Sequence, residues 1–290
     1  MQTTVHRARV VAINDAHIEP AARFLHAHLN SRVAVDAWAS AMRQSWVADA
    51  PNHGYLLYSD DEPVGVHLAF YSQRDIRGRV ERFCNLGAWC VLPAHRRHSL
   101  RLLKALLAQD GYHFTDFSPS GAVVPMNERL GFRHLDTTAS LVPALPWPLL
   151  PSRVRITSDS VVLERNLSSG ELEVFERHRH APAAKHLVLE SHGEHCYVIF
   201  RKDRRKGLPL FASLLHVSSP DVLRRSFRHL SRHLLAHHGV MGVLAEHRIV
   251  GHRPLPSFTL PAPRPKMFKS HSLQADDIDY LCSELVSVPW

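Results

Sequence analysis

The stretch whose residue types best suit anion chemistry is a basic loop between an apolar strand and a helix. Arg82 to Leu92 is apolar enough to predict a buried strand, and a helix with a leucine-rich face is predicted from Leu100. Arg96 and Arg97 lie in the connection, and Arg101 follows in the first turn of the helix. Backbone N–H groups at a helix start, together with arginines, bind anionic groups such as a pyrophosphate. We therefore interpret this loop as an anion site; a solvated basic surface is the alternative.

The strand itself carries candidates for proton and acyl transfer. Glu81, just before it, is a candidate base that would take a proton from an amine directly or through water, and the alternative is a surface acid after a turn. Cys84 and Cys90 are six residues apart, so they should face the same side of a regular strand. A thiol there could carry an acyl group, but we interpret both cysteines as small buried hydrophobic residues.

Histidines recur every four residues in a predicted helix, at His229, His233 and His237. Two histidines at this spacing can bind zinc. No carboxylate or cysteine shares their face, and the neighbouring Arg225 would repel a cation. We interpret them as a solvated basic stripe and predict no metal site.

The composition is that of a globular protein with a basic balance. The chain has 290 residues, 45% hydrophobic, and a formal net charge of +8. Nucleic acid, an anionic membrane surface and a polyphosphorylated small molecule all suit this charge. The four cysteines form no CxxC pair, which favours reduced thiols. We find no run of 18 apolar residues and no apolar signal-peptide core, so we expect no membrane span and a cytoplasmic protein.

Apolar periodicity predicts an alternation of strands and helices in the first half. The second of these helices carries Trp38, Met42 and Trp46 at helical spacing, which is typical of a core face. The helix after the basic loop has Leu100, Leu103, Leu106 and Leu107 as its predicted core stripe. The elements expected before that loop are a strand at 10–13, a helix beginning after Asn14 or Asp15, a helix at 35–46, strands at 54–58 and 64–71, and a polar connection at 75–79.

A proline-rich segment at 145–151 predicts a domain boundary near Leu150, and hence domains 1–150 and 151–290. The predicted elements of the second half repeat the order of those in the first, which suggests a diverged internal repeat as a hypothesis. Its expected elements are a strand at 161–163, a capping box from Ser168 to Glu171, a strand at 195–200, a solvated basic turn at 201–207, a strand at 208–217, a helix with Pro220 at its first position that ends at Gly239, a strand at 240–245, and a C-terminal helix from Asp276.

Residues 8 to 140 resemble the GNAT (GCN5-related N-acetyltransferase) superfamily. Arg96 to Arg101 lies where that family has Arg/Gln-x-x-Gly-x-Gly/Ala, and Glu128 to Phe132 is similar to the family's closing Glu-Lys-Leu-Gly-Phe. The resemblance implies an α/β (α+β) fold with a mixed, mostly antiparallel sheet flanked by helices. With the repeat, it implies two tandem GNAT-like domains, the second one degenerate.

The resemblance also implies a site for acetyl-CoA or another acyl-CoA as co-substrate. The backbone near Cys90 would pair with the pantetheine arm, and N–H groups from Arg97 to Leu102 would hold the pyrophosphate. The residues implied in donor binding are Cys90, Val91, Leu92, Arg96, Arg97, His98, Ser99, Leu100, Arg101, Ser118 and Ser120, the last two being equally suited to N-capping.

This sequence departs from the family pattern at three positions. Ser99 and Arg101 replace the two glycines of the loop, so Arg101 would have to point outward. Asn127 stands where many members carry the tyrosine that protonates the leaving thiolate. Glu81 and Asn127 are therefore the candidate catalytic residues.

Three functions fit these features. The first is transfer of an acetyl or other acyl group from acyl-CoA to an amine or hydroxyl of a small-molecule or peptide acceptor. The second is a transferase that uses aminoacyl-tRNA, since tandem GNAT-like folds occur in such enzymes, although nucleic acid is not the favoured partner. The third is a non-catalytic binding protein on degenerate acyltransferase folds. The sequence leaves the oligomeric state open.

Overall fold

The computed structural model describes residues 8–44, 46–147, 153–205 and 208–290. Within this part the chain forms two compact units. Unit 1 comprises Met1–Arg133, Met267–Asp277 and Cys282–Trp290, and unit 2 comprises His134–Lys266 and Ile278–Leu281. The predicted boundary residue, Leu150, lies outside the described residues. The units themselves divide after Arg133, because the strand at 139–143 pairs into the sheet of unit 2.

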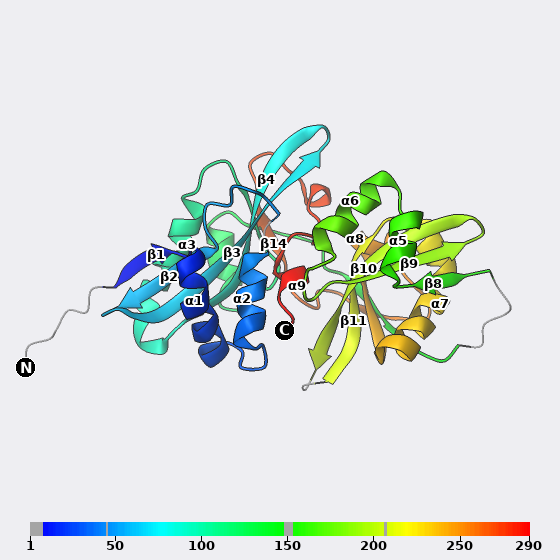
Figure 1. Ribbon diagram of the computed structural model, residues 1–290, viewed down its shortest axis with the longest axis horizontal. Helices are drawn as coiled ribbons and strands as arrows, with labels where there is room; N and C mark the ends of the chain where they lie inside the picture. Colours follow the sequence, from blue (N-terminus) through cyan, green and yellow to red (C-terminus); the bar gives the residue numbers. More distant parts are fainter. Residues whose placement is uncertain (1–7, 45, 148–152, 206–207) are drawn as a thin grey trace, which may run out of the picture. The chain divides into compact units, whose positions relative to one another are not determined.

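A mixed sheet forms the centre of unit 1 (Figure 1). β1 to β4 pair antiparallel in turn, β4 and β5 are parallel, and β14 is antiparallel to β5. In spatial order its described strands are β1 (Arg9–Ala12), β2 (Gly54–Ser59), β3 (Glu62–Ile76), β4 (Arg79–Val91), β5 (His113–Asp116), β14 (Met267–Lys269) and β6 (Arg133–His134).

The hairpin of β3 and β4 is longer than predicted. The segment at 75–79, expected as a polar connection, is mostly strand, with a turn at Arg77 and Gly78, whose φ angles are 57° and 78°. The paired strands project from the body of unit 1 (Figure 1). The cross-strand pairs Ile76↔Arg79 and Asp75↔Val80 keep this arm extended.

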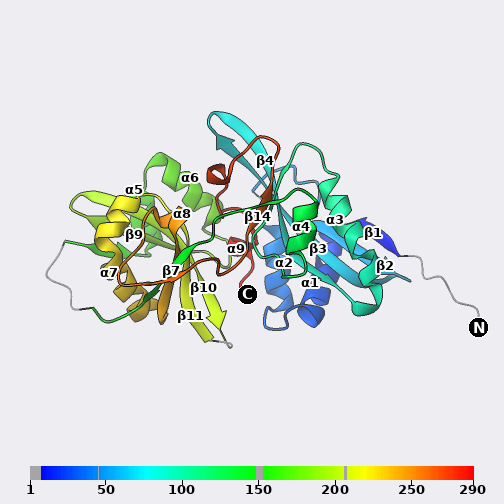
Figure 2. The same cartoon turned by 180° about the vertical axis from the view of Figure 1, so that it is seen from behind.

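Helices cover both faces of the sheet. α1 and α2 lie on one face and α3 and α4 on the other, as the two opposite views show (Figures 1 and 2). Asn14 caps α1 by accepting from Ala16 N, as expected of its side chain. The described helices of unit 1 are α1 (Asp15–His28), α2 (Val35–Arg43), the 3₁₀ helix η1 (Pro93–His98), α3 (Ser99–Leu107), α4 (Val124–Arg129), the 3₁₀ helix η2 (Ala275–Asp277) and α9 (Glu284–Ser287).

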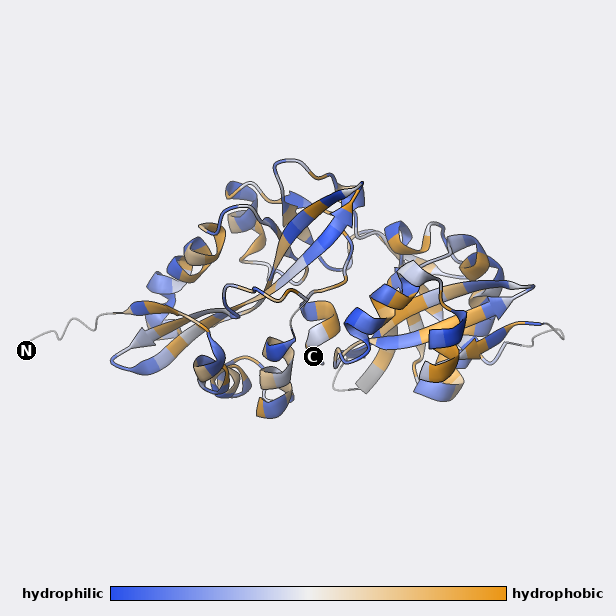
Figure 3. Cartoon of the chain, turned by 45° about the horizontal axis from the view of Figure 1, so that its top comes forward, coloured by the Kyte–Doolittle hydropathy of each residue, from blue (hydrophilic) through white to orange (hydrophobic). Residues whose placement is uncertain are grey.

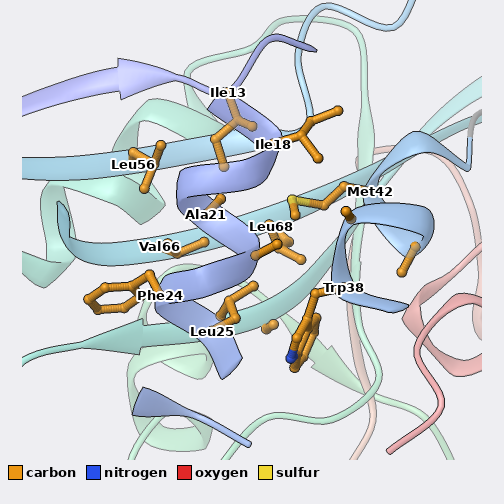
Figure 4. Packing of buried hydrophobic residues seen from close by; sticks show 14 of the residues in the cluster. Ile13, Ile18, Ala21, Phe24, Leu25, Trp38, Met42, Leu56, Val66 and Leu68 are labelled. Atoms are coloured by element: carbon orange, nitrogen blue, oxygen red, sulfur yellow. The ribbon is translucent and has the colours of Figure 1, made fainter. Parts of the chain in front are cut away.

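The core under α1 and α2 joins apolar residues of these helices to β2, β3 and β4 (Figure 4). Trp38 and Met42 are buried in it, as their spacing predicts, and Trp290 packs edge-on to Trp38 at 5.3 Å between ring centroids. Trp46 lies beyond the end of α2 and forms a bridge with Ser72. The predicted helix was therefore too long.

The core face of α3 also differs from the prediction. Leu103 and Leu106 are buried as expected, but Leu100 is 45% exposed and Leu102 is buried instead. η1 runs directly into α3, and this sets the rotation of the first turn. The apolar face begins at Leu102.

Unit 2 is built on a second sheet with the same pairing order. From one edge, β8 to β11 pair antiparallel in turn, β11 and β12 are parallel, and β7 is antiparallel to β12. Apolar residues concentrate on the strands of both sheets (Figure 3). Its described strands are β8 (Arg155–Thr157), β9 (Lys185–Ser191), β10 (Glu194–Arg205), β11 (Leu208–Val217), β12 (Gly242–Glu246), β7 (Ala139–Pro143) and β13 (Phe258–Leu260).

The recurring order of pairs agrees with the hypothesis of an internal repeat. In both sheets a helix, α3 or α7, connects the two parallel strands. Each sheet also receives one strand from a distant part of the chain. β7 comes before the rest of unit 2, and β14 comes after it.

Local helix signals in unit 2 were predicted correctly in two places. Ser168 and Glu171 form the capping box of α6 (Ser169–His178). Pro220 begins α7 (Pro220–His238), and Gly239 ends it with a φ of 66°. Two further helices are described in this unit, α5 (Ser160–Asn166) and α8 (His247–Val250).

Three predictions for the second half were wrong. Val161 to Leu163 lies in α5 (Ser160–Asn166), because the Asp159 side chain accepts from the N–H groups of Val161 and Val162 and starts a helix. The basic run from Arg201 is not a solvated turn, since β10 continues to Arg205. The helix expected from Asp276 is divided into η2 and the short α9.

Candidate functional site

The candidate site lies where β4 and β5 separate, which we call the fork. The two parallel strands pair from Phe83↔His113 to Leu86↔Asp116, and β4 then continues beside β3 to Val91. Among the described residues, no strand lies along the other edge of β4 from Gly87 to Val91. Backbone groups on that edge are therefore available to a bound molecule.

A β-bulge changes the direction of the side chains at the fork. The register of β3 and β4 shifts between His67 and Ala69, opposite Gly87 and Ala88. As a result Cys84 packs with the core under α3, and Cys90 packs with the core under α1. The prediction that the two cysteines face the same side was wrong, since it assumed a regular strand.

Cys90 is poorly suited to act as a nucleophile. It is half-buried, and its Sγ lies 3.5 Å from the backbone oxygen of His28. Burial raises the pKa of the Cys90 thiol, although Arg96 acts in the opposite direction. Cys84 is fully buried, and its pKa is raised by burial to about 12.

Four buried polar residues and the exposed Ser118 gather at the fork around two carboxyl groups. Asn127 Nδ2 donates to Asp116 Oδ2 at 2.9 Å, and Ser118 N donates to Asp116 Oδ1 at 3.3 Å. Ser118 Oγ donates to Glu284 Oε1 at 3.0 Å, and Glu284 N donates to Asn85 Oδ1 at 2.9 Å. We call Asn85, Asp116, Ser118, Asn127 and Glu284 the fork cluster.

The two carboxyl groups of the fork cluster hold protons more tightly than ordinary ones. Burial, and after it nearby Asp116, raise the pKa of Glu284 to about 8, while the polar side chains of Ser118 and Asn85 act in the opposite direction. Burial also raises the pKa of Asp116 to about 6, against the hydrogen bonds from Asn127 and Ser118. The pair therefore titrates across the neutral range.

The fork cluster contains one residue that the sequence identified as catalytic and two that it missed. Asn127 is fully buried beside Asp116, in the cluster. Asp116 and Glu284 were not predicted, and Glu284 is 199 residues from its partner Asn85. The only local signal for Asp116 and Glu284 was that each is an acidic residue within a mainly apolar segment.

Glu81 lies elsewhere on β4. Its Oε2 is 2.9 Å from Nε2 of the buried His113. Gly87 is six positions further along the strand, which is about 20 Å of chain. The structure thus does not bring Glu81 and Asn127 together.

The basic loop is formed by η1 and the start of α3. Arg96 and Arg97 are exposed, and Arg97 Nε donates to His98 Nε2 at 3.1 Å. Ser99 N donates to the carbonyl of Arg96. Arg101 turns away, with its Nη1 2.7 Å from the carbonyl of Ala8.

The remaining residues predicted to bind the donor lie on both sides of the fork. Val91 ends β4 and Leu92 precedes η1, and both are partly buried; Leu92 N donates to the carbonyl of Val64 at 2.9 Å. Leu100 is exposed at the start of α3. Ser120 is not the N-cap of α4, which is Val123 and makes no side-chain cap; the Ser120 carbonyl accepts from Val123 N at 2.8 Å.

The corresponding position in unit 2, at the start of α7, carries negative charge. Glu171 Oε2 accepts from His195 Nε2 at 2.7 Å and from Ser168. Burial would raise the pKa of Glu171, but the hydrogen bonds from His195, Ser218 and Ser168 lower it to about 2. Asp221 lies in the first turn of α7. Two acids at this helix start disfavour a bound anion.

The described part of the chain has neither a cluster of metal ligands nor a membrane-spanning helix. No group of three or more histidine, cysteine, aspartate or glutamate residues there could hold a metal ion. No described helix is both long and apolar enough to cross a membrane.

Solved structures with the same fold include acyltransferases. The chain is similar to a probable N-acyltransferase of Enterococcus faecalis (13% identity, 93% of this chain and 74% of that chain, TM-score 0.60) and to a GCN5-related N-acetyltransferase of Anabaena variabilis (10%, 90% and 72%, TM-score 0.59). It is also similar to the Saccharomyces cerevisiae N-myristoyltransferase solved with bound myristoyl-CoA (10%, 90% and 82%, TM-score 0.52).

No protein-family model and no curated protein matched the sequence. The structural likeness extends over both units, and it shows that the chain has the GNAT fold. The predicted fold class, a mixed and mostly antiparallel arrangement flanked by helices, is confirmed.

Proposed function

We propose that the protein is an acyltransferase that moves an acetyl or other acyl group from acyl-CoA to an amine or hydroxyl acceptor. The observation that carries this proposal is the fork of unit 1 beside an exposed basic loop. The free edge of β4 offers hydrogen-bonding groups to an extended chain, and Arg96 and Arg97 offer charge to phosphates. An acyl-CoA has both an extended chain, its pantetheine arm, and phosphate groups.

In this proposal the donor occupies unit 1. Its pyrophosphate lies at the start of α3, and its pantetheine arm follows β4 from Val91 toward Gly87. A backbone N–H of β4 polarises the thioester carbonyl, and the acceptor attacks the carbonyl carbon directly. The acids at the start of α7 support assigning donor binding to unit 1 rather than unit 2.

Two departures from the family pattern are compatible with this role. Arg101, which replaces a glycine, is directed to Ala8 and leaves the loop surface unobstructed by its guanidinium. Asn127, which replaces the tyrosine, is bonded to Asp116 and would position that carboxyl group rather than donate a proton itself. Glu81 is a weaker candidate base because of its distance along β4.

Calorimetric titration with CoA tests the donor site. Arg96→Gln with Arg97→Gln removes two charge-assisted contacts, each worth about 1 kcal/mol at an exposed site, so Kd should rise about 30-fold. Arg224→Gln, which changes an exposed arginine of α7, is the matched control and should leave Kd unchanged. Equal affinity of all three proteins would contradict the assigned donor site.

The alternative functions give different results in the same series. A transferase that uses aminoacyl-tRNA would retain tRNA in a salt-sensitive manner and would not bind CoA. A non-catalytic protein would show neither CoA binding nor turnover. Arg201 of the basic run is buried in an ion pair with Asp203, so it offers no exposed charge to tRNA.

A further inference from the structure

Glu284 is a fully buried acid that is only partly satisfied. Its Oε1 accepts from Ser118, but its Oε2 has no hydrogen-bond partner among the described residues. An unsatisfied buried carboxyl oxygen costs free energy, so a residue of this kind calls for an explanation. A proton-bearing group of a bound molecule would satisfy it.

Glu284 lies over the first residue of β4 beyond the fork. A Cβ placed on Gly87 would be 3.4 Å from Glu284 Cβ, so the absence of a side chain at Gly87 brings the two backbones together. Ser118, which holds Glu284, is itself exposed. Ser118 donates to Oε1, so the unsatisfied Oε2 is the carboxyl oxygen left for a molecule that lies along the free edge of β4.

We propose that Glu284 is the base of the acyl transfer and accepts the proton of the attacking acceptor on its Oε2. The inference rests on the proposed function, because it needs a thioester at the fork. The acceptor nitrogen or oxygen bonds to the carbonyl carbon, and its N–H or O–H proton passes to the Glu284 carboxylate. The carbon–sulfur bond breaks with its electron pair on the CoA sulfur. The thiolate then takes that proton, which restores the carboxylate.

The surroundings of Glu284 make its charge sensitive to one neighbour. Asp116 on β5 is the charged group that acts on it. Ser118 donates to its Oε1, and Asn85 accepts from its backbone N–H. On the other elements packed against α9, the charged residues of α2, Asp36 and Arg43, are exposed. On β4, the titratable side chain nearest to Gly87 in sequence on its N-terminal side is Cys84, which packs in the core under α3. Residues 83–91 of β4 include no aspartate, glutamate, lysine or arginine.

The pH dependence follows from the raised pKa of Glu284, about 8. Only the ionised carboxylate accepts a proton, so the rate should rise as pH increases through 8. Removing the negative charge of Asp116 should lower the pKa of Glu284 and move this rise to lower pH. A merely structural role for either residue would not shift the profile.

The test measures release of free CoA thiol from acetyl-CoA with hydroxylamine as acceptor, from pH 6 to pH 10 by design. Hydroxylamine is used because it is mostly uncharged above neutral pH, and its direct reaction with the thioester in the absence of protein is subtracted at each pH. Glu284→Gln should lower kcat by about 10²- to 10⁴-fold and remove the inflection, with the Kd for CoA unchanged. Asp116→Asn should shift the inflection downward, and Glu284→Asp should restore part of the rate. Glu62→Gln, a change of an exposed acid on β3, is the matched control.

Failure of this inference is distinguishable from failure of the proposed function. If Glu284→Gln keeps the wild-type rate and pH profile, Glu284 is not the base. Wild-type protein that binds CoA but turns over no acetyl-CoA also overturns the role of Glu284, and the donor site stands. Wild-type protein that does not bind CoA overturns both. If Glu284→Gln does not fold, a pH profile of Asp116→Asn equal to that of the wild type refutes the inference.

Discussion

Gly87 is the position at which the fork is most sensitive to a single added methyl group. In Gly87→Ala the new Cβ would lie 2.7 Å from Cε2 and 3.3 Å from Cδ2 of Phe70, and 3.4 Å from Cβ of Glu284. Phe70 is 2% exposed, and its ring packs on Trp46 at 6.3 Å between centroids, so it has little room to move. Overpacking of a core of this kind costs about 1–3 kcal/mol. We expect the free energy of unfolding of unit 1 to fall by about 2 kcal/mol.

Urea unfolding followed by tryptophan fluorescence measures this change. Four of the five tryptophans, Trp38, Trp46, Trp89 and Trp290, belong to unit 1, so the signal reports mainly on that unit. At a slope of about 2 kcal/mol per molar urea, the midpoint should fall by about 1 M.

Gly121→Ala is the matched control for this measurement. No atom lies within 4 Å of a Cβ at Gly121, and its φ is not positive. The control should keep the wild-type midpoint within error. A Gly87→Ala midpoint equal to that of Gly121→Ala would refute the packing of Gly87 against Phe70.

Two further predictions concern buried groups. Arg201→Met should lower the stability of unit 2 by about 3 kcal/mol, because Asp203, 3.1 Å from Arg201 Nε and 5% exposed, would lose its main partner. Urea unfolding followed by circular dichroism measures this loss of stability. The double variant Arg201→Met with Asp203→Asn should recover part of it. An Arg201→Met variant as stable as the wild type would contradict the prediction. Iodoacetamide should alkylate Cys90 in the native protein, and Cys84, Cys196 and Cys282 only in denaturant, because only Cys90 is not buried. Mass spectrometry of the peptides measures this, and equal labelling of Cys84 would show that the core of unit 1 is open.

Local signals in the sequence were sufficient for much of the fold. Asn14, Ser168 with Glu171, and Pro220 act through neighbours at most four residues away, and each starts a helix as expected. Val161 to Leu163 was misassigned because three consecutive apolar residues fit a buried strand and a helix equally well. The cap supplied by Asp159 decides between them, and it lies just outside the apolar run.

The basic loop was predictable and the fork cluster was not, for one physical reason. Arg96 and Arg97 are adjacent in the chain and follow a strand, so their placement is a local property. Asp116 and Glu284 meet only because residues 166 positions apart, Ser118 and Glu284, form a hydrogen bond in the folded chain. No periodicity or spacing encodes such a contact. The β-bulge that separates the directions of Cys84 and Cys90 is also set by pairing with β3.

The path of the chain explains why the fork is completed so late in the sequence. β14, which pairs along β5, and the segment Cys282–Trp290 both follow the strands of unit 2, yet they belong to unit 1. Without them β5 would be an exposed sheet edge, Asn85 would lose its bond to Glu284 N, and the core under α2 would lose Val288. The first 133 residues therefore supply the loop, the free edge of β4 and Asp116, but not the unsatisfied acid. In the proposed reaction, donor binding is a property of the first part of the chain, and proton transfer depends on its return to unit 1.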